Sequence, residues 1–279
     1  MLKIAVPNKG SLSETAATML EEAGYRGRRD SKELIVRDAR NEVEFFYLRP
    51  RDIATYVGSG ALDVGITGRD LLLDSGSEAV EVQGLGFARS TFRFAGPAGR
   101  FAGEADLQGM RVASSYDGLV AQHLADRGID ARLVRLDGAV ESAVRLGVAD
   151  AIADVVETGA TLRAQGLEVF GDPILASEAV LISNGGEHAA LDTLRRRLQG
   201  VIVARDYVLV DYDIARDRLD AAVAVAAGFE SATVSPLHDP EWAAVRVMVR
   251  RDETNQIMDA LADVGARAII VTRIHAARI

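Results

Sequence analysis

Two carboxylates, two hydroxyls and a glycine stand close together between residues 154 and 161, where they could bind a phosphorylated sugar. An apolar run over residues 151–156 carries Asp154, and Thr158-Gly159-Ala160-Thr161 follows before a helix-compatible stretch that Gly166 should end. A glycine lets the backbone approach a ligand, and the first amides of a helix favour an anion. Asp154 and Glu157 stand where the hydroxyls of a ribose would lie. The segment therefore predicts a site for a ribose 5-phosphate.

The same pattern also has a purely structural explanation. Thr-Gly turns follow buried strands in many α/β proteins, where the threonine only caps the next helix. A carboxylate at the end of an apolar strand speaks against that explanation, because a buried charge without a partner is costly. Asp150 lies roughly 13 Å from Asp154 along an extended strand, too far to share one sugar. We interpret Asp150 as a residue that starts the strand.

The segment resembles the phosphoribosyl-pyrophosphate loop of phosphoribosyltransferases. Two further motifs are Lys-Ile-Ala-Val-Pro-Asn-Lys-Gly at residues 3–10 and Asp-Val-Gly-Ile-Thr-Gly at residues 63–68. With them, the chain resembles the ATP phosphoribosyltransferase family in its long form, over essentially its whole length and in the same order. It departs from the family at Ser11, where many members carry a basic residue.

The resemblance implies attack of the adenine N1 of ATP on C1 of phosphoribosyl pyrophosphate, with Mg²⁺ on the departing pyrophosphate. Lys9, Arg49 and Asp154 are the expected catalytic residues, and Lys9 and Arg49 each follow an apolar strand. No protein metal ligand is expected. Phosphoribosyl pyrophosphate is expected at Asp154, Glu157, Thr158, Gly159, Ala160, Thr161 and Leu162, and ATP at Asp70, Leu71 and Tyr116.

Two other functions stay open at this point. A phosphoribosyltransferase acting on a different base would share the loop, but such enzymes usually carry two adjacent acids where this chain has Ala153-Asp154. A bilobal small-anion-binding protein would share the two lobes, but it would need a secretion signal. The N-terminus instead begins with a strand pattern.

Composition narrows the functional classes. The chain has no cysteine, which excludes disulfides and thiol catalysis. A net charge of −9 argues against a nucleic-acid partner, so basic residues must be concentrated locally to attract polyphosphates. The candidates are Lys9, Arg49, Arg51 and Arg69. Since no apolar run reaches membrane-spanning length, we expect no membrane contact and a cytoplasmic protein.

Strand and helix patterns alternate over the first ~180 residues, which predicts an α/β fold with parallel sheets. The sequence Thr-Gly-Arg-Asp-Leu at residues 67–71 is similar to Thr-Gly-Ala-Thr-Leu at residues 158–162. A predicted strand and helix precede each of these turns, over residues 45–58 before the first and over residues 133–146 before the second. We infer a two-lobed, periplasmic-binding-protein-like core. Lobe I would span residues 1–90 and lobe II residues 91–180, with a return segment, 181–205, packed on lobe I.

Residues 206–279 show a strand-helix-strand-strand-helix-strand pattern, with Gly228 and Gly265 ending the helices. This order predicts a ferredoxin-like domain and resembles an ACT-type amino-acid-sensing domain. The resemblance implies histidine as an allosteric inhibitor, and Asp213, Thr233 and Ser235 are the candidate contacts. It also implies a homo-oligomer, a dimer and a hexamer.

The four histidines, at positions 123, 188, 238 and 275, have no metal-ligand spacing. We expect all four to be ordinary surface or turn residues.

Overall fold

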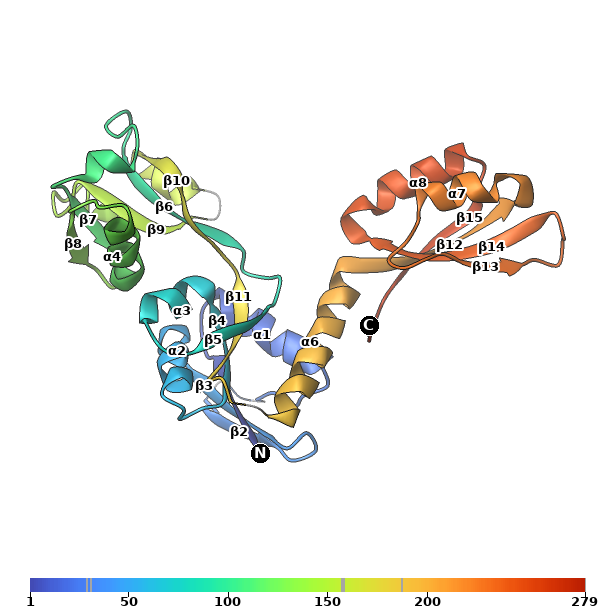
Figure 1. Ribbon diagram of the computed structural model, residues 1–279, viewed down its shortest axis with the longest axis horizontal. Helices are drawn as coiled ribbons and strands as arrows, with labels where there is room; N and C mark the ends of the chain where they lie inside the picture. The colour runs from blue at the N-terminus through green and yellow to red at the C-terminus, as the bar shows by residue number, and fades with distance from the viewer. Residues whose placement is uncertain (29, 31, 157–158, 187, 279) are drawn as a thin grey trace. The chain divides into compact units, whose positions relative to one another are not determined.

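The computed structural model describes residues 1–28, 30, 32–156, 159–186 and 188–278. The chain divides into two compact units, residues 1–193 and 194–279 (Figure 1). Within the described ranges, none of the helices has both the length and the apolarity to cross a membrane.

Lobe I of the first unit is built on a six-stranded sheet, here sheet A, in the order β2-β3-β1-β4-β11-β5. β1 is parallel to β3 and β4, whereas β2 and β11 run antiparallel to their neighbours. Its strands are β1 (Leu2–Pro7), β2 (Ile35–Asp38), β3 (Val43–Leu48), β4 (Val64–Gly68), β5 (Val80–Gly84) and β11 (Ala179–Ser183).

Three helices accompany sheet A: α1 (Ser11–Glu22), α2 (Pro50–Gly58) and α3 (Arg69–Ser75). Pro50 stands in the first turn of α2, where its missing N–H costs nothing. Gly10 precedes α1 with a φ of 78°, which a residue with a side chain rarely adopts. The core of the lobe is mostly apolar, with Ile4, Phe45 and Ile53 wholly buried, and the buried Thr67 hydroxyl donates a hydrogen bond to the Pro50 carbonyl.

Lobe II is built on a five-stranded sheet, here sheet B, in the order β10-β6-β9-β7-β8. Phe92 and Phe94 of β6 are wholly buried beneath α4, and each buried phenylalanine contributes roughly 1.5–3 kcal/mol. The elements are β6 (Ser90–Pro97), η1 (Glu104–Leu107), β7 (Arg111–Ser114), α4 (Asp117–Asp126), β8 (Arg132–Arg135), η2 (Val140–Ser142), β9 (Ala151–Val156), α5 (Ala160–Ala164) and β10 (Leu167–Ser177).

The expectation of parallel sheets is right only for three adjacent strands of each sheet, which are β3, β1 and β4 in sheet A and β9, β7 and β8 in sheet B. β7 is parallel to β8 and β9, but β6 runs antiparallel to both β9 and β10. The chain leaves lobe I after β5 and returns to it through β10 and β11. Strands that carry the chain between lobes do not belong to a strand-helix-strand crossover, so they need not be parallel.

α6 (Ala189–Asp206) leads from the first unit into the second. The second unit contains β12 (Tyr207–Ala215), η3 (Arg216–Arg218), α7 (Leu219–Val225), β13 (Thr233–Pro236), β14 (Trp242–Arg250), η4 (Arg251–Glu253), α8 (Thr254–Asp263) and β15 (Arg267–Arg273). Its antiparallel sheet, here sheet C, has the order β13-β14-β12-β15. This confirms the predicted ferredoxin-like order.

Alternation along β12 explains which face of sheet C is covered. Val208, Val210, Tyr212 and Ile214 are buried with apolar residues of α7 and α8. Both helices lie on one side of the sheet (Figure 1). The β12 residues that alternate with these buried residues, including Asp213, therefore point to the opposite face of sheet C.

Candidate active site

β9 delivers the candidate carboxylate. Ala151, Ile152 and Ala153 are wholly buried because β9 lies between β6 and β7 inside sheet B. Asp154 follows them and is only partly buried, opposite Arg93 of β6. The apolar run thus places its one charged side chain where the strand reaches the edge of the lobe's core.

A glycine in the left-handed region and a helix start follow β9, which are the backbone features that the sequence predicts here. Gly159 has a φ of 69° and immediately precedes α5, which begins at Ala160. A side chain at Gly159 would be strained, and its Cβ would lie 3.1 Å from Nη1 of Arg163. Glu157 and Thr158, two of the predicted contacts, lie outside the described residues.

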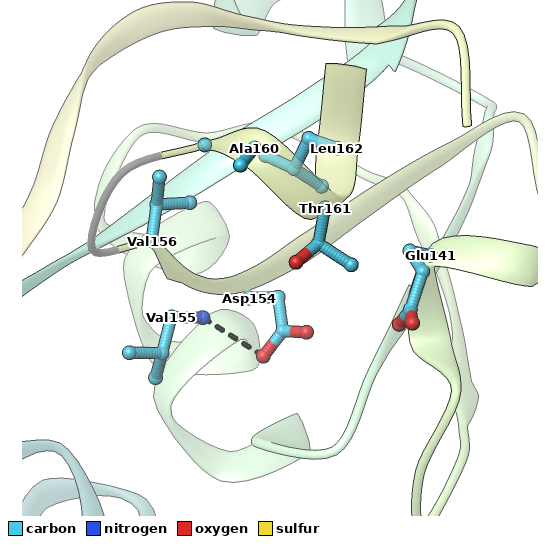
Figure 2. A pocket seen from close by; sticks show the side chains of 8 residues that line it. Glu141, Asp154, Val155, Val156, Ala160, Thr161 and Leu162 are labelled. Carbon is cyan, nitrogen blue, oxygen red and sulfur yellow. Dashed lines mark hydrogen bonds between the residues drawn. The ribbon is translucent and has the colours of Figure 1, made fainter. Parts of the chain in front are cut away.

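A pocket of about 270 Å³ opens between this loop and η2. Asp154 and Thr161 lie on one side of it, and Glu141 lies across from them (Figure 2). Figure 2 also shows the Val155 amide bonded to the Asp154 carboxylate, at 2.8 Å. Its lining residues are Glu141, Asp154, Val155, Val156, Gly159, Ala160, Thr161 and Leu162.

Burial raises the pKa of Asp154, and the negative charges of Glu141 and Asp70 add to that effect. The hydrogen bond from the Val155 amide opposes them by stabilising the carboxylate. Two carboxylates facing one pocket repel each other until a cation or a set of hydroxyl donors separates them. The pocket therefore suits a ligand that brings hydroxyl groups or a divalent cation.

Glu141 is the charged lining residue that the sequence does not predict. We expected residues 133–146 to form a strand and then a helix, and this is wrong for the helix. After β8, the chain forms only the short 3₁₀ turn η2, and Ala139 has a φ of 50°. Val140 and Ala143 are buried, but Leu146 is 74% exposed and Gly138 and Gly147 flank the segment, so only its first turn has an apolar face to bury. The irregular turn carries Glu141 to the pocket.

Lys9 and Arg49 lie in lobe I, at the ends of the neighbouring parallel strands β1 and β3. The register pairs Pro7 with Leu48, so both basic residues follow the same edge of sheet A, as predicted. Both are exposed. Neither lines the pocket at Asp154, whose described lining comes from lobe II alone.

The candidate nucleotide residues Asp70 and Tyr116 come from different lobes and lie together. Burial, followed by the charge and hydrogen bonding of Asp70, raises the pKa of Tyr116. The guanidinium of Arg51 lies 4.8 Å from the centre of the Tyr116 ring. Asp70 is also bonded to Ser177, at 2.9 Å. Leu71 is buried, so its side chain belongs largely to the packing of lobe I.

The three candidate histidine contacts share the open face of sheet C. Asp213 and Ser235 both pair with Ala244 of β14, so they stand in one row across the sheet. Thr233 stands in the next row, opposite Arg246, whose guanidinium is paired with Asp211 at 2.7 Å. Asp213 also pairs with Arg267 of β15.

The expectation for the four histidines is correct at three positions and wrong at one. His188, His238 and His275 are exposed, whereas His123 on α4 is 8% exposed. Its Nε2 lies 3.1 Å from Glu104, which Arg127 also contacts. Position on the inner face of α4 explains the burial. In the described residues, no three acidic or histidine side chains gather closely enough to hold a metal ion.

The first unit has the fold of bilobal ligand-binding proteins. The ligand-binding core of GluR0 from Nostoc punctiforme, in complex with glutamate, superposes with a TM-score of 0.50 at 13% identity, over 71% of this chain and 92% of that one. That likeness concerns the fold alone. The ATP phosphoribosyl transferase (HisG:HisZ) complex from Thermotoga maritima superposes with a TM-score of 0.64 at 30% identity, over 72% of this chain and 98% of that one.

Sequence comparisons identify the family. A family model described as ATP phosphoribosyltransferase matches residues 49–200, and the HisG C-terminal domain model matches residues 204–276. The ATP phosphoribosyltransferases of Paenarthrobacter aurescens and Streptomyces avermitilis are 65% and 62% identical, each over 100% of both chains. The chain therefore belongs to the ATP phosphoribosyltransferase family. It is a transferase of histidine biosynthesis, of the long form that carries a C-terminal regulatory domain.

Proposed function

We propose that the pocket between β9 and α5 binds the ribose 5-phosphate part of phosphoribosyl pyrophosphate. Gly159 lets the backbone approach the 5-phosphate, and the first amides of α5 donate to it. Thr161 adds a hydroxyl donor on the same side of the pocket. The Asp154 carboxylate accepts hydrogen bonds from the ribose hydroxyls, which relieves the cost of its burial.

Mg²⁺ fits this site as a companion of the substrate. Mg²⁺ in proteins is usually held by one or two carboxylates together with substrate phosphates. The facing carboxylates of Asp154 and Glu141 would supply those ligands, although no protein ligand for the metal is expected from the sequence. When bound there, Mg²⁺ would neutralise negative charge on the pyrophosphate. The carboxylates themselves would orient the sugar.

In the reaction we propose, the adenine N1 of ATP attacks C1 of the sugar, the bond from C1 to the pyrophosphate oxygen breaks, and pyrophosphate leaves. Negative charge grows on the leaving group and positive charge on the ring, so the protein acts by positioning and electrostatics. In this proposal the Asp154 carboxylate lies beside the sugar ring and stabilises the positive charge that develops there. Lys9 and Arg49, both exposed at the edge of sheet A, stabilise the leaving pyrophosphate.

We place ATP near Asp70, Leu71 and Tyr116. The support is that Asp70 and Tyr116 meet where lobes I and II come together, with the Arg51 guanidinium over the tyrosine ring. An aromatic ring and a guanidinium both stack on a purine. Asp70 supplies a hydrogen-bond acceptor to the base.

Histidine would bind the open face of sheet C. The support is that Asp213, Ser235 and Thr233 occupy two adjacent rows of that face. The Asp213 carboxylate receives the ammonium of the amino acid, and the two hydroxyls take its carboxylate or ring. We also propose a homo-oligomer that forms both a dimer and a hexamer, which light scattering of the purified protein would test.

The observation that carries the phosphoribosyl proposal is the convergence of Asp154, Gly159 and Thr161 on one pocket. Its test is Thr161→Ala, with binding of phosphoribosyl pyrophosphate and Mg²⁺ measured by calorimetry. Loss of a hydrogen bond to a charged group costs about 1.5–3 kcal/mol, which weakens binding roughly 10- to 150-fold. Thr55→Ala, an exposed threonine of α2, is the matched control. Unchanged affinity in Thr161→Ala would leave Thr161 a helix-start residue only.

A further inference from the structure

Lobes I and II touch through α3 and α4, and Asp74 is the centre of that contact. Asp74 lies near the end of α3 in lobe I, with only 7% of its side chain exposed. Its Oδ1 accepts a hydrogen bond from the Leu119 amide, 3.2 Å away in the first turn of α4 in lobe II. Its Oδ2 lies 2.6 Å from Nη1 of Arg51 in lobe I. One carboxylate therefore joins a helix end of one lobe to a cation of the other.

The backbones of the two helices also approach closely. A Cβ on Gly118 would overlap the carbonyl oxygen of Asp74. Gly118 has an ordinary, negative φ, so it is not needed for an unusual backbone conformation. The absence of a side chain at this position is what lets α4 reach Asp74.

The same contact holds two side chains beside the nucleotide position. The guanidinium of Arg51 forms an ion pair with Asp74 and also lies over the ring of Tyr116. Tyr116 immediately precedes α4, whose first turn Asp74 holds. Tyr116 in turn contacts Asp70, which is bonded to Ser177 at the end of the returning strand β10.

From this geometry we propose that Asp74 is a positioning residue, which latches lobe I to lobe II and fixes Arg51 and Tyr116 at the ATP position. The second half of this statement rests on the proposed placement of ATP, and the first half does not. Asp74 contacts neither substrate in this assignment. It acts through Arg51, and through the first turn of α4.

Two substitutions separate the charge of Asp74 from its contact with α4. Asp74→Asn keeps an oxygen for the Leu119 amide but removes the charge that holds Arg51. Gly118→Ala keeps Asp74 intact but inserts a methyl group between the helices. Since carbon and oxygen pack at about 3.5 Å or more, the methyl group must push the helices apart by roughly an ångström. Glu78→Gln, an exposed carboxylate just beyond α3, is the control.

The separation of the lobes can be measured directly because the chain has no cysteine. Thr55→Cys on α2 and Ala121→Cys on α4, both exposed, accept spin labels on lobes I and II. The distance distribution between the labels is expected to be broader or longer in Gly118→Ala and in Asp74→Asn than in the parent and in Glu78→Gln. Unchanged distributions in both variants would overturn the latch, whatever their activity.

Kinetics tests the positioning role. Misplacing a substrate-positioning side chain by about an ångström can lower an enzyme's rate up to a hundredfold. We therefore expect the KM for ATP to rise between fivefold and a hundredfold in both variants. The affinity for ribose 5-phosphate, which needs only the pocket of lobe II, should change less than about twofold. Equal losses for both ligands would mean general damage to the fold and would overturn the positioning role. If the distance between the labels changes but the KM for ATP does not, the role of Asp74 in joining the lobes is upheld, whereas its positioning role and the placement of ATP at Tyr116 are overturned.

Discussion

Asp154→Asn should separate the catalytic value of this carboxylate from its cost to stability. Asparagine has nearly the same size and can keep the hydrogen bond from the Val155 amide, which is 2.8 Å long. The substitution removes one charged acceptor for the ribose hydroxyls and places an N–H₂ donor in the pocket. A charged hydrogen bond contributes about 1.5–3 kcal/mol, so kcat/KM should fall roughly 10- to 150-fold.

The effect on stability should have the opposite sign. The pKa of Asp154 is raised above 3.8 by burial and by the charges of Glu141 and Asp70, so ionising this carboxyl destabilises the folded state. A raised pKa means that the folded state is favoured most when the group is protonated, and that stability is lost as pH rises through the raised pKa. At neutral pH the asparagine variant should therefore unfold at a higher temperature than the parent.

The measurement is thermal unfolding of both proteins at neutral and at mildly acidic pH, together with pyrophosphate release under steady-state conditions. The stability gap should be widest at neutral pH and should shrink as the pH falls, because the folded parent takes up a proton at Asp154 at a higher pH than the unfolded chain does. A variant that is less stable at neutral pH, or one with unchanged kcat/KM, would refute the argument. In the first case the carboxylate supports the fold, and in the second it does not touch the sugar.

Three further changes test other parts of the molecule. Gly159 has a φ of 69°, and holding an alanine in that conformation costs about 1–2 kcal/mol, so Gly159→Ala should weaken phosphoribosyl pyrophosphate binding roughly 5- to 30-fold in calorimetry. Unchanged affinity would show that the loop tolerates a side chain. Asp213→Ala should stay active but lose inhibition by histidine, in an inhibition titration; an unchanged inhibition curve would place the effector elsewhere. His123→Ala should lower the free energy of unfolding, measured in denaturant, by about 2–4 kcal/mol, because it empties a buried position and leaves Glu104 without one partner. A loss within experimental error would show that the contact between His123 and Glu104 is dispensable.

Local patterns in the sequence predicted the elements that depend on local physics. The alternation in residues 206–279 and the glycines at 228 and 265 predicted the order of the C-terminal domain, and both glycines have positive φ. Thr-Gly after an apolar strand likewise predicted the loop at Gly159 and the helix after it. In these places periodicity and a left-handed backbone position are visible without knowledge of tertiary contacts.

The features that the sequence did not reveal depend on contacts between distant segments. Glu141 reaches the pocket because an expected helix is replaced by a 3₁₀ turn, and no periodicity marks such a position. Asp74 and Leu119 are 45 residues apart, and neither stands in a motif. His123 is buried through its pairing with Glu104, 19 residues away. Side-chain pairing of this kind depends on the folded arrangement of the lobes.

The distribution of charge between the lobes gives the latch a reason to exist. The described pocket of lobe II offers two carboxylates for the sugar and the first amides of α5 for its 5-phosphate, but its described lining includes no basic side chain for a pyrophosphate. The exposed cations Lys9 and Arg49 belong to lobe I. A substrate that carries a ribose at one end and a pyrophosphate at the other is then fully complemented only when both lobes contribute. Because entropy favours separate lobes moving independently, a fixed contact such as that of Asp74 with Arg51 and Leu119 lowers the cost of bringing them together. Under the proposed roles, lobe II binds the sugar and lobe I stabilises the leaving group. The contact at Asp74 holds the two lobes together so that both can act on one substrate molecule.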